Sequence, residues 1–398
     1  MKITLCHALV AAVALASSSV RVMAQSSIAP SRTWDELKAE TQARAERGAY
    51  PLAGLPASEV AEALARIRSL DRDEWAAGFS AIGQRYLDSA ASKPGKPAEA
   101  RAAYLMAWRF FSFAAWPVTN SAGKRDAYRK AIAAFREYAA LLDTPPELVR
   151  IPYESAEIIG YLGLPTVRPA PLVITVAGLD SRKENTVDRG SAYFAHGLGY
   201  FALDLPGTGE SPVKVVDPAA ERMFSKVLDY LRTRSEVDSA RIAIQGSSWG
   251  SYWAARMGIV ERQRLRAALV QGGPVHGYFQ AEWQTKALGT REYLFDLFPA
   301  RASLYGVRSV DEFLAYGPRM SLENGGLIDQ PATRMLLING AHDTQVPIDD
   351  LYRLLRSGSP KEAWVNPQGG HMGRSRDWPD ERIFREVVLP WLETALKR

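Results

Sequence analysis

The sequence predicts an α/β fold in which a mostly parallel, doubly wound sheet follows an all-helical N-terminal segment. Two observations carry this prediction. Up to about residue 143, apolar residues recur at spacings of three and four, which is the period of an amphipathic helix. After Pro146, short β-branched runs alternate with helical stretches. This alternation is typical of a parallel sheet that carries helices on its faces.

The N-terminal segment contains four periodic stretches, at residues 60–70, 75–87, 100–113 and 128–142. We expect about five helices, with breaks at residues 80–83 and 92–95. Pro145-Pro146 should end the segment, because proline cannot continue a helix and constrains the residue before it. The predicted helical domain spans residues 25–146.

Eight short runs after Pro146 are expected to be strands: 148–153, 157–162, 172–176, 200–203, 241–245, 267–271, 335–338 and 363–365. The first two are joined by a short turn near Ser155, so they should form an antiparallel hairpin at the edge of the sheet. Residues 275–327 are rich in aromatics and too long for a plain crossover. We expect them to form a lid within a second domain of residues 147–398.

The N-terminus has the features of a secretory signal. Lys2 is followed by an apolar run over residues 3–16, and Val22-Met23-Ala24 precedes the expected cleavage after Ala24. A signal over residues 1–24 predicts a periplasmic or secreted protein. The apolar run is shorter than the about 20 residues that a spanning helix needs, so we expect no membrane span.

Composition excludes several classes of function. Cys6, the only cysteine, lies in the predicted signal, which leaves no thiol for disulfides, metal ligands or a cysteine nucleophile. The formal charge of +5 includes Lys2 and Arg21, and no basic run is interleaved with aromatics, so we expect no nucleic-acid partner. No phosphate loop or metal-ligand spacing occurs, and we expect no cofactor and no metal.

Gly246-Ser247-Ser248-Trp249-Gly250 is the sharpest chemical signal. It follows the predicted strand 241–245 and precedes a helical stretch at residues 251–259, which is the context of a nucleophile elbow. The turn pushes Ser248 out at the C-terminal edge of the sheet, and the two glycines let strand and helix approach. Ser247 lacks such flanking glycines. We therefore predict that Ser248 is the nucleophile, and a serine at the elbow favours acyl transfer.

The partners of a Ser-His-acid triad should follow in the order acid and then histidine, each on a loop after a late strand. Asp343 follows the predicted strand 335–338, and His371 follows the predicted strand 363–365. We predict that His371 is the general base and that Asp343 orients it. His342, next to the acid, is expected to brace its loop.

Two backbone amides must hold the oxyanion of the tetrahedral intermediate, and the candidates are those of Leu179 and Trp249. Candidate substrate-binding residues are a histidine and aromatics near the elbow or in the insert 275–327: His276, Tyr252, Tyr278, Phe279 and Trp283. For each of these, packing in the core is an equally good interpretation.

The helical domain, the loop Gly178-Leu179-Asp180-Ser181-Arg182-Lys183-Glu184 and the elbow together resemble one branch of the α/β hydrolases. This branch contains dihydroxypseudooxynicotine hydrolase and the fermentation-respiration-switch type esterases. The likeness runs from about Arg101 to the C-terminus, and the Gly-Leu-Asp-Ser-x-Lys-Glu loop is its most specific part. It implies an α/β-hydrolase fold, a helical domain that caps the active site, and a triad of Ser248, Asp343 and His371.

The favoured function is a serine hydrolase that acts on a small or medium carboxylic ester or lactone through an acyl-enzyme. The same triad permits hydrolysis of a carbon–carbon bond in a β-diketone-like compound, which the resemblance allows. A binding protein that kept the fold is the alternative from another class, but the complete triad argues against it. A peptidase is also open, although the short strands of a propeller are missing. The expected partner is a small molecule, and a monomer and a homodimer both stay open.

Overall fold

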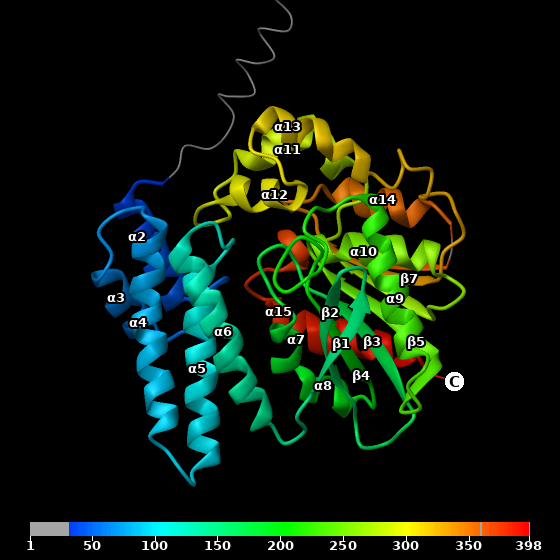
Figure 1. Ribbon diagram of the computed structural model, residues 1–398. Helices are drawn as coiled ribbons and strands as arrows, with labels where there is room; N and C mark the ends of the chain where they lie inside the picture. Colours follow the sequence, from blue (N-terminus) through cyan, green and yellow to red (C-terminus); the bar gives the residue numbers. More distant parts are fainter. Residues whose placement is uncertain (1–31, 359, 398) are drawn as a thin grey trace, which may run out of the picture.

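A bundle of helices packs beside a central sheet that carries its own helices (Figure 1). The computed structural model describes residues 32–358 and 360–397. The predicted signal over residues 1–24 and the first residues of the predicted helical domain lie outside the described residues. Within the described ranges, no helix has both the length and the apolar character needed to cross a membrane.

The N-terminal domain consists of α2 (Trp34–Glu46), α3 (Ala57–Ala65), α4 (Arg72–Ala91), α5 (Pro97–Ala115) and α6 (Ala122–Ala140). Side chains cap two of the long helices, α4 and α6, where they begin. Asp71 accepts hydrogen bonds from two amides in the first turn of α4, and Ser121 accepts one in the first turn of α6. The described part of this domain thus has five helices, in agreement with the about five predicted.

One predicted helix break is wrong. Residues 80–83 lie inside α4, which continues through them to Ala91. Gly83 serves helix packing instead, because a Cβ there would lie 3.0 Å from a ring carbon of Phe111 on the neighbouring helix α5. The break predicted at residues 92–95 is confirmed, since it separates α4 from α5.

The sheet consists of β1 (Glu147–Tyr153), β2 (Ala156–Gly163), β3 (Ala170–Val176), β4 (Gly199–Leu203), β5 (Val237–Ser247), β6 (Ala267–Gln271), β7 (Arg334–Gly340) and β8 (Lys361–Asn366). Their order across it is β1-β2-β4-β3-β5-β6-β7-β8. β1 and β2 form the predicted antiparallel hairpin at one edge, and β2 also pairs antiparallel with β4. All other neighbours are parallel, so the predicted fold class is confirmed.

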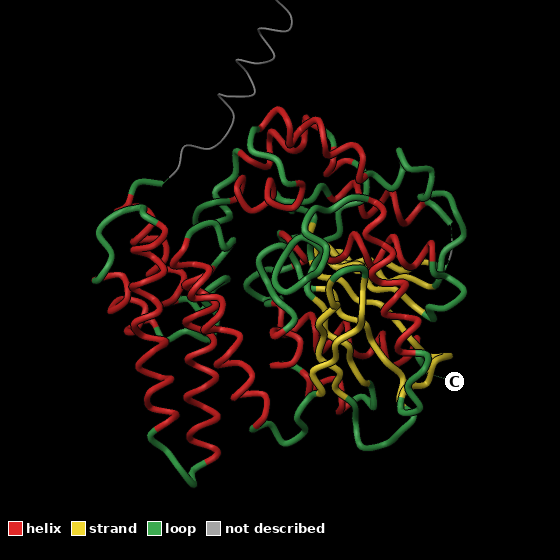
Figure 2. Tube along the Cα trace, in the orientation of Figure 1, coloured by secondary structure: helices red, strands yellow, loops and turns green. Residues whose placement is uncertain are grey.

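Helices cover both faces of the sheet (Figure 2). Along β3, Leu172 and Ile174 point into one core layer and Val173 points into the other, as the period of a strand requires. The further helices of this domain are α7 (Glu184–Asp188), α8 (Gly190–Ala195), α9 (Glu221–Leu231), α10 (Trp249–Val260), α14 (Ile348–Arg356), α15 (Asp380–Ile383) and α16 (Leu389–Ala395). The second layer also takes in side chains of α5 and α6, so the helical domain rests on the sheet domain.

The insert predicted at residues 275–327 contains α11 (Ala281–Leu288), α12 (Leu297–Tyr305) and α13 (Val310–Tyr316), drawn in yellow at the top of Figure 1. Between α11 and α12 runs a segment that we call the strap, residues 291–296. Leu294 of the strap is buried in the core of the helical domain. Arg32 donates hydrogen bonds of 2.6–2.7 Å to three strap carbonyl oxygens. Asp296 accepts two from Arg72 of α4, at 2.8 and 2.7 Å, so insert and helical domain are tied together.

A buried lysine joins the loops that follow β3 and β4. The Nζ of Lys183 lies 2.9 Å from a carboxylate oxygen of Asp204, 2.8 Å from one of Glu210 and 3.0 Å from one of Glu184. Burial by itself would lower the pKa of Lys183, but these carboxylates outweigh it and raise the pKa well above its ordinary value. The cluster therefore ties the loop after β3, which contains Lys183, to the loop after β4, which contains Asp204 and Glu210.

Replacing Lys183 with methionine keeps the bulk of the side chain and leaves buried Asp204 and Glu184 without their cation. We expect the free energy of unfolding, measured by urea denaturation, to fall by about 3–5 kcal/mol. Lys130→Met is the matched control, because Lys130 is partly exposed and its ion pair with Asp126, at 3.1 Å, lies on the surface. Its effect should stay below about 1 kcal/mol. Equal effects of the two substitutions would contradict a stabilising role for the cluster.

Candidate active site

Ser248 occupies a sharp turn between β5 and α10. Its φ of 52° lies in the left-handed region, which few non-glycine residues adopt. The flanking glycines make the turn sterically feasible. A Cβ on Gly246 would lie 2.3 Å from the carbonyl oxygen of Gly250, and a Cβ on Gly250 would lie 2.4 Å from that of Val176 in β3. The strained backbone therefore depends on close backbone contacts that only glycine permits.

The structure brings the three predicted side chains together in one hydrogen-bonded line. Nε2 of His371 lies 2.7 Å from Oγ of Ser248. Nδ1 of His371 lies 2.8 Å from Oδ2 of Asp343. With the proton on Nδ1, His371 donates to the carboxylate and its Nε2 is free to accept the serine proton. His342 is exposed, and its backbone N–H donates to the carbonyl oxygen of Gly369 at 2.9 Å.

The carboxylate of Asp343 is buried and well supplied with donors. Its Oδ1 accepts the backbone N–H of Gln345 at 2.7 Å and that of Val346 at 3.0 Å. Burial alone would raise the pKa of Asp343, but the adjacent His371 and these two amides outweigh it and hold the pKa below its ordinary value. Asp343 is thus ionised and fixed in orientation beside the imidazole.

Two polar side chains at the ends of neighbouring strands hold the loop of His371. Oδ1 of Asn339, in β7, accepts the backbone N–H of Met372 at 3.1 Å. Nε2 of Gln271, at the end of β6, donates to the carbonyl oxygen of Met372 at 3.1 Å. Sequence reasoning missed both residues, because a polar residue at a strand end carries no mark of the loop that it will contact.

Leu179 and Trp249, whose amides are predicted to form an oxyanion hole, line the same cavity as Ser248. The loop after β3 lies against the elbow, since a Cβ on Gly178 would be 3.4 Å from Cβ of Ser248. Leu179 follows in this loop. Trp249 is the first residue of α10, and the first amides of a helix have no intrahelical acceptor. Both residues therefore border the same cavity as the nucleophile predicted from the sequence.

The cavity over Ser248 has a volume of about 710 Å³. Its wall combines three parts of the chain that are distant in the sequence. Tyr50 and Trp116 come from the helical domain, Asp180 comes from the loop after β3, and Tyr293 and Arg301 come from the insert. Volumes of this order are typical of small-molecule sites.

Of the predicted substrate-binding residues, Tyr278 lines the cavity, and its hydroxyl accepts a hydrogen bond of 3.0 Å from Nε1 of Trp249. His276, Tyr252, Phe279 and Trp283 do not line it, which corrects the expectation for these four residues. Each has a packing role. Tyr252 is fully buried in the core among other rings. His276 bonds to Ser321 at 2.8 Å, and Nε1 of Trp283 donates to the carbonyl oxygen of Gln345 at 3.1 Å.

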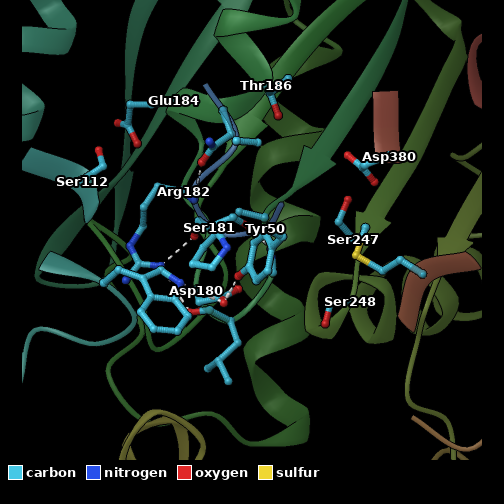
Figure 3. A pocket seen from close by; sticks show the side chains of 18 of the residues that line it. Tyr50, Ser112, Asp180, Ser181, Arg182, Glu184, Thr186, Ser247, Ser248 and Asp380 are labelled. Atoms are coloured by element: carbon cyan, nitrogen blue, oxygen red, sulfur yellow. Dashed lines mark hydrogen bonds between the residues drawn. The ribbon is translucent and has the colours of Figure 1, made fainter. Parts of the chain in front are cut away.

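Asp180 is the main wall residue that sequence reasoning did not single out. Figure 3 shows the ring of Tyr50 beside it, and the Tyr50 hydroxyl donates to its carboxylate. Nε1 of Trp116 donates to the same oxygen at 3.1 Å. Burial raises the pKa of Asp180, and a hydrogen bond to Tyr293 and the charge of Arg374 offset only part of this effect. The only available signal was its place in the Gly-Leu-Asp-Ser loop.

We find no group of three or more His, Cys, Asp or Glu side chains with the geometry of a metal site in the part of the chain that the structure describes. The described residues of the cavity wall include ion pairs such as Arg109–Asp188, hydroxyl groups and aromatic rings.

A nucleophile elbow after β5 in a mostly parallel eight-stranded sheet defines an α/β hydrolase. Comparison with known proteins agrees and narrows the class. The sequence model of the family described as esterase FrsA-like matches residues 62–359. The chain therefore belongs to the FrsA-like esterase family, and the resemblance inferred from the sequence is confirmed.

Two relatives illustrate the relationship. The alpha/beta hydrolase ucsC of an Acremonium species is 32% identical over 241 residues, which are 52% of this chain and 49% of the relative. Esterase FrsA of Photobacterium profundum is 26% identical over 259 residues, 64% of this chain and 61% of the relative. The chain thus spans between about half and three fifths of these relatives' lengths.

Two solved structures share the fold. 2,6-Dihydroxy-pseudo-oxynicotine hydrolase superposes with a TM-score of 0.71 at 20% identity, over 85% of this chain and 92% of that one. AbyA5 gives a TM-score of 0.70 at 19% identity, over 90% of this chain and 94% of that one. The match to these structures extends beyond the sheet domain.

Replacing Gly250 with alanine places a Cβ 2.4 Å from the carbonyl oxygen of Val176, and β3 and α10 must move apart. We expect the free energy of unfolding to fall by about 1–3 kcal/mol, which is the usual cost of overpacking. Gly325→Ala is the control, because its Cβ would meet nothing nearer than the carbonyl oxygen of Ser321 at 3.3 Å. Thermal and urea unfolding would measure both. Gly250→Ala as stable as Gly325→Ala would show that the elbow tolerates a side chain.

Proposed function

We propose that the chain is a serine hydrolase that cleaves a small or medium carboxylic ester or lactone through an acyl-enzyme on Ser248. The observation that carries this proposal is the hydrogen-bonded line from Ser248 to His371 to Asp343, with distances of 2.7 and 2.8 Å, at the wall of the 710 Å³ cavity. Membership of an esterase family supports the same reaction class.

In the proposed reaction, Nε2 of His371 takes the proton of Ser248 as Oγ attacks the substrate carbonyl carbon. Asp343 stabilises the imidazolium that forms and keeps the ring in the orientation seen in the structure. The amides of Leu179 and Trp249 stabilise the oxyanion. His371 then gives its proton to the leaving alcohol, and water releases the acyl group by the same route.

We further propose that the helical domain and the insert together form a cap over Ser248. Both contribute side chains to the cavity wall, and the strap holds them to each other. A roof of this kind excludes water from the reacting atoms and limits the size of the substrate. Cavity size and aromatic rings such as Tyr278 and Trp116 favour small substrates with an apolar or aromatic part.

Substitutions in the proposed triad test the mechanism. Ser248→Ala and His371→Ala should each lower kcat/KM on 4-nitrophenyl acetate by about 10⁴-fold or more, and Asp343→Ala by somewhat less, since the acid does not exchange the proton. His342→Ala is the matched control for His371→Ala and should retain activity. Activity that survives in Ser248→Ala but disappears in Ser247→Ala would move the nucleophile to the neighbouring serine.

Tyr50 tests the cap. Removing its ring in Tyr50→Ala should widen the cavity and raise kcat/KM for 4-nitrophenyl benzoate relative to the acetate by about tenfold. Tyr50→Phe keeps the ring and loses only the hydroxyl that donates to Asp180, so its ratio should stay near that of the wild type. If Tyr50→Ala left the ratio unchanged, the helical domain would not limit the size of the substrate.

A further inference from the structure

Arg301, on α12, is a buried cation in the wall of the cavity. The residue is 3% exposed. Its Nη1 donates to Oε1 of Gln284 at 3.0 Å, and its Nη2 donates to Oε1 of Gln345 at 2.8 Å. Its Cζ lies 5.2 Å from the centroid of the Tyr278 ring. All three partners are neutral, whereas a guanidinium keeps its charge in any protein environment.

The two other buried cations of the described chain are neutralised. Lys183 contacts three carboxylates, the nearest at 2.8 Å. Lys124 lies 3.6 Å from a carboxylate oxygen of Asp296. Within residues 32–358 and 360–397, Arg301 has no carboxylate oxygen within 4.0 Å. A buried charge without an opposite charge is costly, so such a residue needs a further reason to be in this place.

Three of the other wall arginines pair with carboxylates of the same wall. Arg109 pairs with Asp188 at 3.0 Å, Arg189 with Asp380 at 2.8 Å, and Arg385 with Glu381 at 2.5 Å.

Besides Arg301, four charged wall residues form no ion pair within 4.0 Å among the described residues, namely Asp180, Arg182, Glu292 and Arg374. None of them neutralises Arg301. Arg182 and Arg374 carry positive charge. Their charges lower the pKa of Asp180, but burial has the larger effect and raises it. Glu292 accepts a hydrogen bond of 2.8 Å from Thr344 and forms no ion pair with Arg301 within 4.0 Å. Arg301, which lines the cavity, is therefore not neutralised by any described carboxylate within 4.0 Å.

Arg301 also has donors to spare. A guanidinium carries five N–H groups in a planar fork, and the two hydrogen bonds to Gln284 and Gln345 use two of them. The fork matches the two oxygens of a carboxylate. Because both glutamines hold the guanidinium in place, little side-chain freedom would be lost when an anion binds.

The position of Arg301 relates it to the reacting atoms. Gln345, which binds the guanidinium, donates its backbone N–H to Asp343 at 2.7 Å. Tyr278, whose ring faces the guanidinium, is hydrogen-bonded to Trp249, the residue after Ser248. One intervening residue, Tyr278, thus connects Arg301 to the elbow, and another, Gln345, connects it to Asp343.

We propose that Arg301 binds a carboxylate of the substrate, and that esters carrying a free carboxylate on the acyl side are the substrate class of this site. The inference rests on the proposed ester hydrolysis and names its substrate class. One monoanion matches the charge of the buried Arg301 guanidinium. Its neighbours Gln284, Gln345 and Tyr278 are neutral, so this charge selects the anion.

A matched pair of esters tests the proposal. Mono-4-nitrophenyl glutarate and 4-nitrophenyl pentanoate have acyl chains of equal length and differ in a terminal carboxylate or methyl group. We expect the wild type to prefer the glutarate, and Arg301→Gln to lower the ratio of the two kcat/KM values by roughly 10- to 100-fold, mainly through a higher KM for the glutarate. Arg301→Lys should keep an intermediate ratio.

The control is Arg319→Gln, which removes the same charge from an exposed position on the same insert and should leave the ratio unchanged. A wild-type enzyme without preference for the glutarate, or a ratio that falls equally in Arg301→Gln and Arg319→Gln, would overturn the proposal. The wild-type preference needs no variant, so it decides even if Arg301→Gln does not fold.

A binding measurement separates this proposal from the proposed function. Titration calorimetry of the wild type with glutaramate, which carries a carboxylate and an unreactive amide, should give binding at least about tenfold tighter than with pentanamide. If neither ester is hydrolysed but glutaramate binds selectively, ester hydrolysis fails and the anion site stands. If both esters are hydrolysed and glutaramate binds no better than pentanamide, the anion site fails and the hydrolase stands.

Discussion

The positive φ of Ser248 is the constraint on which the rest of the site depends. At φ 52°, Ser248 places its Oγ 2.7 Å from Nε2 of His371. This conformation requires β3 and α10 to meet at Gly250 without an intervening side chain. The backbone N–H of Ser248 donates to the carbonyl oxygen of Gln271 at 2.8 Å, which ties the turn to β6. Contacts with β3 and β6, rather than the turn alone, thus keep Ser248 in this strained conformation.

The wall of the cavity beside this serine is held together by packing between segments far apart in the sequence. The strap carries Tyr293 into the cavity wall, where its ring lies 5.3 Å from that of Trp116 in the helical domain. At the other end of the strap, Asp296 binds Arg72 and lies near buried Lys124. These contacts join the insert to the helical domain. The two parts of the proposed cap should therefore move together in any opening motion. Arg301 follows directly in α12, so the same attachment positions the proposed anion site.

Local signals predicted most of the fold and the three residues of the proposed triad. The elbow is a five-residue pattern, and the loops of Asp343 and His371 follow strands that their β-branched runs reveal. The cavity wall is not local. Tyr50 and Arg301 border the same cavity as Ser248 only because of tertiary packing, and the periodicity of apolar residues in the sequence does not predict that packing. Tyr252 sits one helical turn from the elbow, yet it points into the core, because spacing along a helix does not tell a cavity from a core.

Direct capture of the acyl-enzyme tests the central claim. Rapid mixing of the wild type with 4-nitrophenyl acetate, followed by acid quenching and mass spectrometry of the digested protein, would locate any covalent adduct. The account predicts a burst of nitrophenol in proportion to enzyme and one added acetyl group on the peptide that contains Ser248. Turnover with no acetylated peptide, or acetylation at a different residue, would contradict it.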